Sequence, residues 1–168
     1  MRVAALCVLT GSAAVFANSM GDPEQNWAEG RYEVPPLPAL DGSSLEPVYV
    51  SAIAQSRFFI DTSSLVVGED SAVRYVLVTE AAGGAQTTMF AGIHCGSGRY
   101  RVYAMEYGGG EWRPAANEDW VPLPANRDSR AEQALAYDYF CNGLVPWQVP
   151  DILRRLRHAP AVLGGGNR

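Results

Sequence analysis

The stretch GAQTTMFAGIHC, residues 84–95, decides the fold, together with the run YRVYA at residues 100–104 that follows a glycine-rich turn. The first run predicts a strand, and the second run predicts its partner. Gly96-Ser97-Gly98 supplies a three-residue reversal between them, and connections this short favour antiparallel neighbours. These residues therefore predict a β-hairpin, and the other segments of the chain are placed around it.

Two further strands precede this hairpin. Residues 73–80, VRYVLVTE, are β-branched or aromatic for most of their length and have apolar side chains on both faces, with Tyr75 and Leu77 on one of them. A strand that is apolar on both faces is usually central in its sheet. Residues 57–61, RFFID, predict a shorter strand that ends in the turn residues Thr62-Ser63-Ser64.

One face of such a meander needs a cover, and a C-terminal helix is predicted to supply it. The segment from Ser129 to Asn142 begins with a capping-box pattern, and Gly143 is a suitable stop. Its apolar stripe follows the helical period at Ala134, Tyr137, Cys141 and Leu144, and Ala136 and Phe140 widen it. Pro150 to His158 predicts a second, short helix. The fold class is therefore α+β: an antiparallel sheet of four to five strands in a meander, a C-terminal helix packed on one face, and a short second helix.

The N-terminus predicts a secretory signal peptide over residues 1–17. Arg2 supplies the positive charge, Val3 to Leu9 the apolar run, and Val15-Phe16-Ala17 the small residues that precede cleavage. A buried N-terminal strand is the alternative interpretation. The apolar run is too short to span a bilayer, and no later segment is long enough.

The mature chain divides into three parts. Residues 18–50 predict an extended, proline-rich arm that Trp27 and Leu37 could fasten to the body. Residues 51–160 are predicted to form a single α+β domain, and residues 161–168 are predicted to be a flexible tail.

Cysteine usage predicts a disulfide. Loss of Cys7 with the signal peptide leaves Cys95 and Cys141, an even pair in an exported chain. Closing the 46 residues between them stabilises the fold by up to about 4 kcal/mol in the loop-entropy model. The alternative makes Cys95 a nucleophile activated by His94. Neighbours in a strand point to opposite faces, which disfavours that pairing.

The charge of the chain argues against polyanionic partners. The net charge is −5, or −6 once Arg2 is removed with the signal peptide, and no basic cluster is present. Nucleic-acid binding and adhesion to anionic membranes both require positive surface, so neither is predicted. An unidentified protein or envelope polymer remains as the predicted partner.

The sequence lacks the common catalytic patterns. It contains no nucleophile elbow, no phosphate loop and too few histidines and free thiols for a predicted zinc site. We therefore predict no catalytic, cofactor-binding or metal-binding residue and no cofactor. One enzymatic alternative remains, a periplasmic hydrolase using His94 with Asp61 or Asp138. A second enzymatic alternative is glycoside cleavage by a pair of carboxylates drawn from Asp61, Glu80, Glu106 and Asp138.

Aromatic residues gather in the predicted loops. They are Trp27, Trp112 and Trp120, with Tyr103 and Tyr107 nearby. Such residues can form a platform for a sugar or a peptide, or they can bury loops against the sheet. The second role is favoured, because tryptophan is mostly buried on average.

Several motifs together resemble a known family. They are FFID at 58–61, SLVVGED at 64–70, VRYVLV at 73–78, FAGIHC at 90–95 and DYFC at 138–141, with Gly84-Ala85, Tyr103-Ala104, Trp112 and Trp120. From Trp27 to Cys141 the chain is similar to the cryptic neisserial protein-like family of small exported proteins of Gram-negative bacteria. The resemblance implies a periplasmic location and supplies no reaction. His94 stands where the family pattern suggests a basic residue such as arginine, which argues against a special role for it. We therefore expect a non-enzymatic binding or structural module of the periplasm or envelope.

Overall fold

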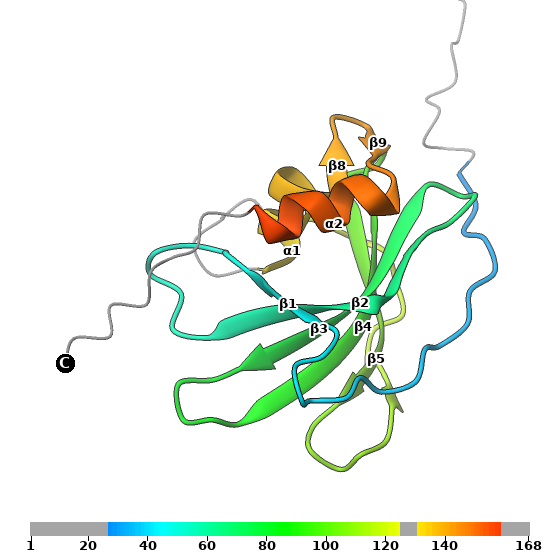
Figure 1. Ribbon diagram of the computed structural model, residues 1–168. Coiled ribbons are helices and arrows are strands. Elements are labelled where there is room, and N and C mark those ends of the chain that lie inside the picture. The colour runs from blue at the N-terminus through cyan, green and yellow to red at the C-terminus, as the bar shows by residue number, and fades with distance from the viewer. Residues whose placement is uncertain (1–26, 125–130, 159–168) are drawn as a thin grey trace, which may run out of the picture.

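The computed structural model describes residues 27–124 and 131–158 and confirms the α+β class (Figure 1). Its main sheet is antiparallel and runs in the order β1-β2-β3-β4-β5-β6, with β7 also paired to β5. The strands are β1 Leu45–Val48, β2 Arg57–Val67, β3 Ala72–Glu80, β4 Gln86–His94, β5 Arg99–Glu106, β6 Arg113–Pro114 and β7 Val121–Pro122. Sequence neighbours pair throughout the first five strands, so the predicted meander is confirmed.

Strand β3 lies in the middle of the sheet, and its first seven residues are all buried. Tyr75 and Leu77 face the larger apolar core, whereas Val76 faces a smaller cluster on the opposite side. Leu77 pairs with Met89, and Val76 pairs with Phe90, so β4 continues both faces. The two-faced apolar pattern of the sequence thus correctly marked the central strand.

Strand β2 is longer than the sequence predicted. Thr62-Ser63-Ser64 was expected to be a turn, but these residues continue the strand through a bulge between Asp61 and Val66. The carboxylate of Asp61 accepts hydrogen bonds from the Ser63 hydroxyl at 2.8 and 2.9 Å. The Ser64 hydroxyl donates to the Asp61 carbonyl and accepts from the Val76 N–H. These polar side chains form hydrogen bonds with backbone groups that the bulge would otherwise leave unpaired.

The helices cover one face of the sheet. They are α1 Ala131–Ala134, the π-helix η2 Leu135–Phe140 that continues it, and α2 Val149–Arg157. Figure 1 shows α1 and α2 together on one side of the strands. Phe140 packs edge-on against Tyr75 with ring centroids 5.0 Å apart, and Ile152 and Leu156 of α2 are buried beside them. The second helix predicted from Pro150 to His158 is confirmed with a shift of one residue.

The first helix ends earlier than predicted. The chain becomes extended at Cys141 and forms the hairpin of β8 Cys141–Asn142 and β9 Val145–Pro146. Within η2 the helix widens, so that the Cys141 N–H donates to the carbonyl of Ala136, five residues earlier. The predicted inward stripe is therefore wrong at Tyr137, which is 56% exposed, and at Leu144, which is 74% exposed, whereas Ala136 and Phe140 are buried as predicted. The capping residue Ser129 lies outside the described residues.

The predicted disulfide between Cys95 and Cys141 is present, with Cα atoms 5.7 Å apart. Cys95 directly follows β4, and Cys141 belongs to the β8–β9 hairpin rather than to a helical stripe. The bond therefore ties the end of β4 to the end of η2. It also excludes Cys95 as a free nucleophile in this state.

The opposite face of the sheet is covered by residues 27–44. This segment, called the arm below, runs past the strands in blue in Figure 1 before it enters β1. Beneath it lies the cluster of Val76, Phe90, Tyr103 and Ala104, with Trp112 and Trp120 packed against it. The sequence did not predict β1, whose Pro47 is tolerated because β1 is an edge strand. Among residues 27–124 and 131–158 no helix is long and apolar enough to cross a membrane. The predicted signal peptide and tail lie outside the described residues.

Candidate functional site

The arm-covered face of the sheet contains a partly buried ionic network centred on Glu29. Arg101 approaches the Glu29 carboxylate at 2.6 Å and Arg74 at 3.3 Å. The Tyr103 hydroxyl donates to it at 2.6 Å, and the Trp120 indole N–H donates at 3.1 Å. These partners come from β3, β5 and the segment before β7, so one arm residue is bonded to three parts of the body.

The network shifts the pKa values of its members. Burial opposes ionisation of Glu29, but hydrogen bonds from Tyr103 and Trp120 and the charge of Arg101 outweigh it and lower the pKa of Glu29. Burial and the adjacent Glu29 carboxylate raise the pKa of Tyr103 above its ordinary value. Glu29 is therefore held as a carboxylate and Tyr103 as a neutral donor. This arrangement fastens the arm to the sheet.

Asp70 forms a second attachment next to the first. Its carboxylate pairs with Arg74 at 2.6 Å and accepts the Gly30 N–H at 2.7 Å, while its carbonyl accepts the Trp27 indole N–H. Despite the opposing effect of burial, the hydrogen bonds from Arg74 and from backbone N–H groups lower the pKa of Asp70 to about 2. The guanidinium of Arg74, 4% exposed, therefore lies between two carboxylates. Asp70 also caps the turn before β3, because its carboxylate accepts the Ala72 N–H at 3.2 Å.

His94 lies at one end of the same face. The Trp27 indole stacks on its ring with centroids 4.2 Å apart, and its Nδ1 is 2.9 Å from the Ser97 hydroxyl. Asp61 cannot serve as its carboxylate partner, because it lies opposite Val76 whereas His94 lies opposite Ala72. Four residues along β3 and two strand spacings separate their Cα atoms by about 16 Å.

The other carboxylates proposed for catalysis do not gather in one place. Asp138 is exposed in η2, within the helical layer that covers the other face of the sheet. Glu80 pairs with Arg57 at the end of β3, and Asp61 is bonded to Ser63. Glu106 lines the pocket described next. No cluster of three or more potential metal ligands occurs in residues 27–124 and 131–158.

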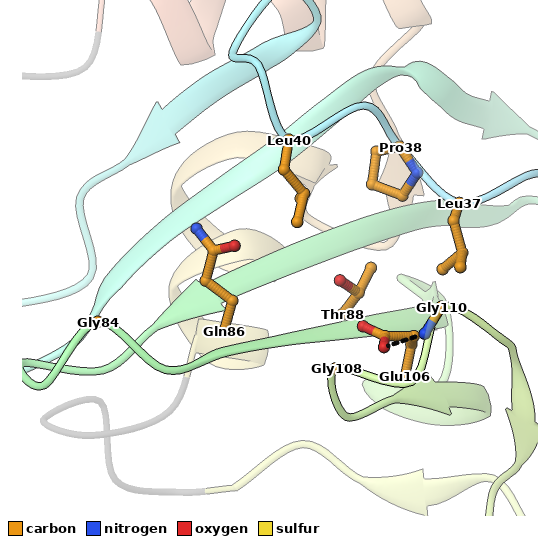
Figure 2. Close-up of a pocket in the computed structure, with 9 residues that line it drawn as sticks. All are labelled: Leu37, Pro38, Leu40, Gly84, Gln86, Thr88, Glu106, Gly108 and Gly110. Carbon is orange, nitrogen blue, oxygen red and sulfur yellow. Dashed lines mark hydrogen bonds between the residues drawn. The ribbon is translucent and has the colours of Figure 1, made fainter.

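A pocket of about 490 Å³ lies between the arm and the ends of β4 and β5. Figure 2 shows the arm residues along one side and the polar side chains opposite them. The residues that line it are Leu37, Pro38, Leu40, Gly84, Gln86, Thr88, Glu106, Gly108 and Gly110. Its volume falls within the range of small-molecule sites.

The floor of the pocket is polar. Thr88 and Glu106 face each other in the β4–β5 register, and both are buried. One Glu106 oxygen accepts the Gly110 N–H at 2.9 Å, drawn as a dashed line in Figure 2. Gly108 and Gly110 both have positive φ, which suits the tight return of the chain over the Glu106 carboxylate. The carboxylate is thus fixed beside the pocket by the loop that follows its own strand.

The loop aromatics mainly bury loops, as the sequence favoured. Trp27 packs edge-on against Trp120, and Trp112 donates through its indole N–H to the Pro35 carbonyl at 2.8 Å. Tyr103 lies between Phe90 and Tyr32 of the arm. Tyr107, 65% exposed, is the exception. These contacts hold the arm beside the pocket that Leu37 and Leu40 line.

Comparison with known proteins identifies the family of the chain. A family model described as the CNP1-like family matches residues 22–157. The chain belongs to the CNP1-like family. One relative is Cryptic neisserial protein 1 of Neisseria gonorrhoeae (strain ATCC 700825 / FA 1090), which is 25% identical over 158 residues, covering 82% of this chain and 77% of that protein. No solved structure matches the chain. The resemblance seen in the sequence is confirmed, and it identifies a family rather than a reaction.

Proposed function

We propose that this protein is an exported, non-enzymatic binding module of the periplasm or envelope, and that the pocket beneath the arm is its ligand site. The observation that carries the proposal is the pocket itself, with an apolar wall from the arm and a polar floor that contains the buried Glu106. The arm is bonded to the sheet through Glu29 and Asp70. The wall is therefore positioned before any ligand arrives, which lowers the entropy lost on binding.

Export is supported by two independent features. The first 17 residues have the three-part pattern of a signal peptide. The Cys95–Cys141 bond fits an oxidising compartment, because disulfides persist there and are rare in the cytosol. Fractionation of cells that express the full chain, followed by intact-mass measurement, tests this part. A periplasmic product that begins at Asn18 is expected, and an uncleaved cytosolic product with free thiols would contradict export.

The proposed division of labour follows the segments of the sequence. The arm, residues 27–44, lies over the sheet of the α+β body. Leu37, Pro38 and Leu40 contribute the wall, while Gln86 and Glu106 contribute polar groups from the body. The ligand would therefore contact both parts at once.

Tryptophan fluorescence of the mature protein, with peptidoglycan fragments and small-molecule envelope fractions, tests the binding role. Trp112 reports on the site because its indole is bonded to Pro35, close to the pocket wall. Gln86→Phe fills the pocket, and Gln55→Phe makes the same change at an exposed loop position. A saturable change that Gln86→Phe abolishes and Gln55→Phe keeps supports the proposal. A change that survives in Gln86→Phe, or no change with any fraction, would contradict it.

A further inference from the structure

The side chain of Glu106 differs from the other carboxyl groups of this face. Glu29 and Asp70 each have an arginine partner within 2.6 Å. Glu106 is only 7% exposed, yet in residues 27–124 and 131–158 no arginine or histidine forms an ion pair with it. Its bond from the Gly110 N–H engages one oxygen. A buried carboxylate is costly unless a cation or several donors compensate it.

Asp61 shows how this fold compensates a buried acid without a cation. Its carboxylate is 2% exposed and receives hydrogen bonds from both the hydroxyl and the backbone N–H of Ser63. In residues 27–124 and 131–158 Glu106 receives one bond of this kind, and it lines a pocket instead of a filled bulge. A molecule in the pocket can therefore add further compensation for its charge.

The residues that line the pocket favour a particular charge and shape in the molecule that binds there. None of the nine lining residues is basic, so nothing there balances an anion. Arg74 and Arg101, farther along the same face, are already bonded to Asp70 and Glu29. Leu37, Pro38 and Leu40 form an apolar wall across from the carboxylate, as Figure 2 shows. A ligand that matches both sides has a positive group at one end and an apolar portion at the other.

We propose that the pocket binds a small organic ammonium compound, with its charged nitrogen on Glu106 and its apolar portion against Leu37 and Leu40. This inference rests on the proposed binding function and adds the chemical class of the ligand. The ammonium group brings several N–H donors and a full positive charge to the free carboxylate oxygen. The pocket volume of about 490 Å³ leaves ample room for a short alkyl chain.

The test uses three probes of one length: hexylammonium, 1-hexanol and hexanoate. The mature, disulfide-bonded protein is labelled with ¹⁵N and titrated with each probe in low salt. The hexylammonium titration is expected to shift the amide signals of Thr88, Gly108 and Gly110, and its affinity is expected to exceed that of the alcohol by about tenfold or more. Hexanoate is expected to leave these signals unmoved, because the carboxylate repels it.

Two variants assign the effect to the carboxylate. Glu106→Gln keeps the shape and an acceptor for the Gly110 N–H, and it is expected to weaken hexylammonium binding about tenfold or more. Glu111→Gln removes the same charge at an exposed position five residues away and is expected to leave binding unchanged. The ranking of the three probes on the unmodified protein does not depend on whether either variant folds.

The outcomes separate this inference from the proposed function. Equal binding of the alcohol or of hexanoate, unchanged affinity in Glu106→Gln, or no shift with hexylammonium would overturn the ammonium class. If no envelope fraction shows binding that Gln86→Phe abolishes, the proposed binding function itself is overturned. Binding of a neutral or acidic envelope compound in the pocket would leave the function standing and refute the ligand class.

Discussion

Replacing Glu29 with glutamine should loosen the arm from the sheet. The carboxylate accepts charge-assisted hydrogen bonds from Arg101 at 2.6 Å and Arg74 at 3.3 Å, and neutral ones from Tyr103 and Trp120. Glutamine keeps the size of the side chain, but its one oxygen can keep only one of the two donor pairs, Tyr103 with Arg74 or Arg101 with Trp120. It loses the charge and turns its NH₂ group toward the other pair, in which only the Tyr103 hydroxyl could accept from it.

The expected cost follows from the partners left behind. Removing one member of a buried ion pair costs about 3–5 kcal/mol, because the other charge stays buried without compensation. Here Arg74 keeps Asp70 at 2.6 Å, and Arg101 keeps a long contact with Glu118 at 3.8 Å. We therefore expect the lower end of that range, about 3 kcal/mol, which lowers Tm by about 6–12 °C in a domain of this size.

Chemical denaturation followed by tryptophan fluorescence measures this loss. Glu33→Gln, an exposed change of the same charge four residues along the arm, is the matched control and should stay within about 0.5 kcal/mol of the parent. Limited trypsin digestion adds a local readout, because loosening of the arm exposes the bond after Arg31. Equal stability of the two variants, with equal rates of cleavage at Arg31, would refute the claim that Glu29 fastens the arm.

Three further perturbations test other parts of the account. Replacing Cys95 and Cys141 together by serine should lower the free energy of unfolding by up to about 4 kcal/mol, measured by denaturation, and an unchanged midpoint would contradict the proposed constraint. The pKa of Asp70 is lowered from 3.8 to about 2, so its contribution to stability is complete at neutral pH and is lost as pH falls from about 4 to 2. Asp70→Asn should lower stability at pH 7 and flatten the acid limb of a Tm–pH profile; an acid limb as steep as that of the parent would contradict this. The pKa of Tyr103 is raised above 10.0, so its contribution to stability is present below pH 10 and is lost as pH rises further. Absorbance at 295 nm should therefore show less phenolate in the folded protein at pH 11 than after unfolding in denaturant, and equal phenolate would contradict this.

The sheet could be predicted because its rules are local. Alternating side chains and short glycine turns determine the pairing of neighbours, and Gly84 and Gly98 do adopt positive φ in those turns. The disulfide followed from cysteine arithmetic and export, without the geometry of its surroundings. The second helix had its start marked by Pro150. Each of these inferences needs only a few consecutive residues or a count.

The end of the first helix could not be predicted from its pattern. The period of 3.6 residues assigned Tyr137 and Leu144 to the buried side, but the π-helical turn changes the period and the chain leaves the helix at Cys141. The turn at Gly143, taken as a helix stop, instead lies between the strands of a hairpin. A pattern of apolar residues cannot distinguish these outcomes when packing against the sheet decides between them.

The arm network and the pocket were missed for a different reason. Glu29 meets Trp120 across 91 positions of sequence, and no local rule joins residues so far apart. One indication was present: Arg74 lies in the middle of an otherwise apolar strand, and a buried arginine requires a carboxylate partner. Nothing in the sequence indicated that Glu106 would lie beside a pocket without an arginine partner.

The most direct test of the central claim is the map of ¹H–¹⁵N amide shifts during titration of the mature protein with hexylammonium. The account predicts saturable shifts at Gly84, Thr88, Gly108 and Gly110 that disappear in Gln86→Phe. Shifts that appear instead around His94, or that persist in Gln86→Phe, would show that the pocket between arm and sheet is not the binding site.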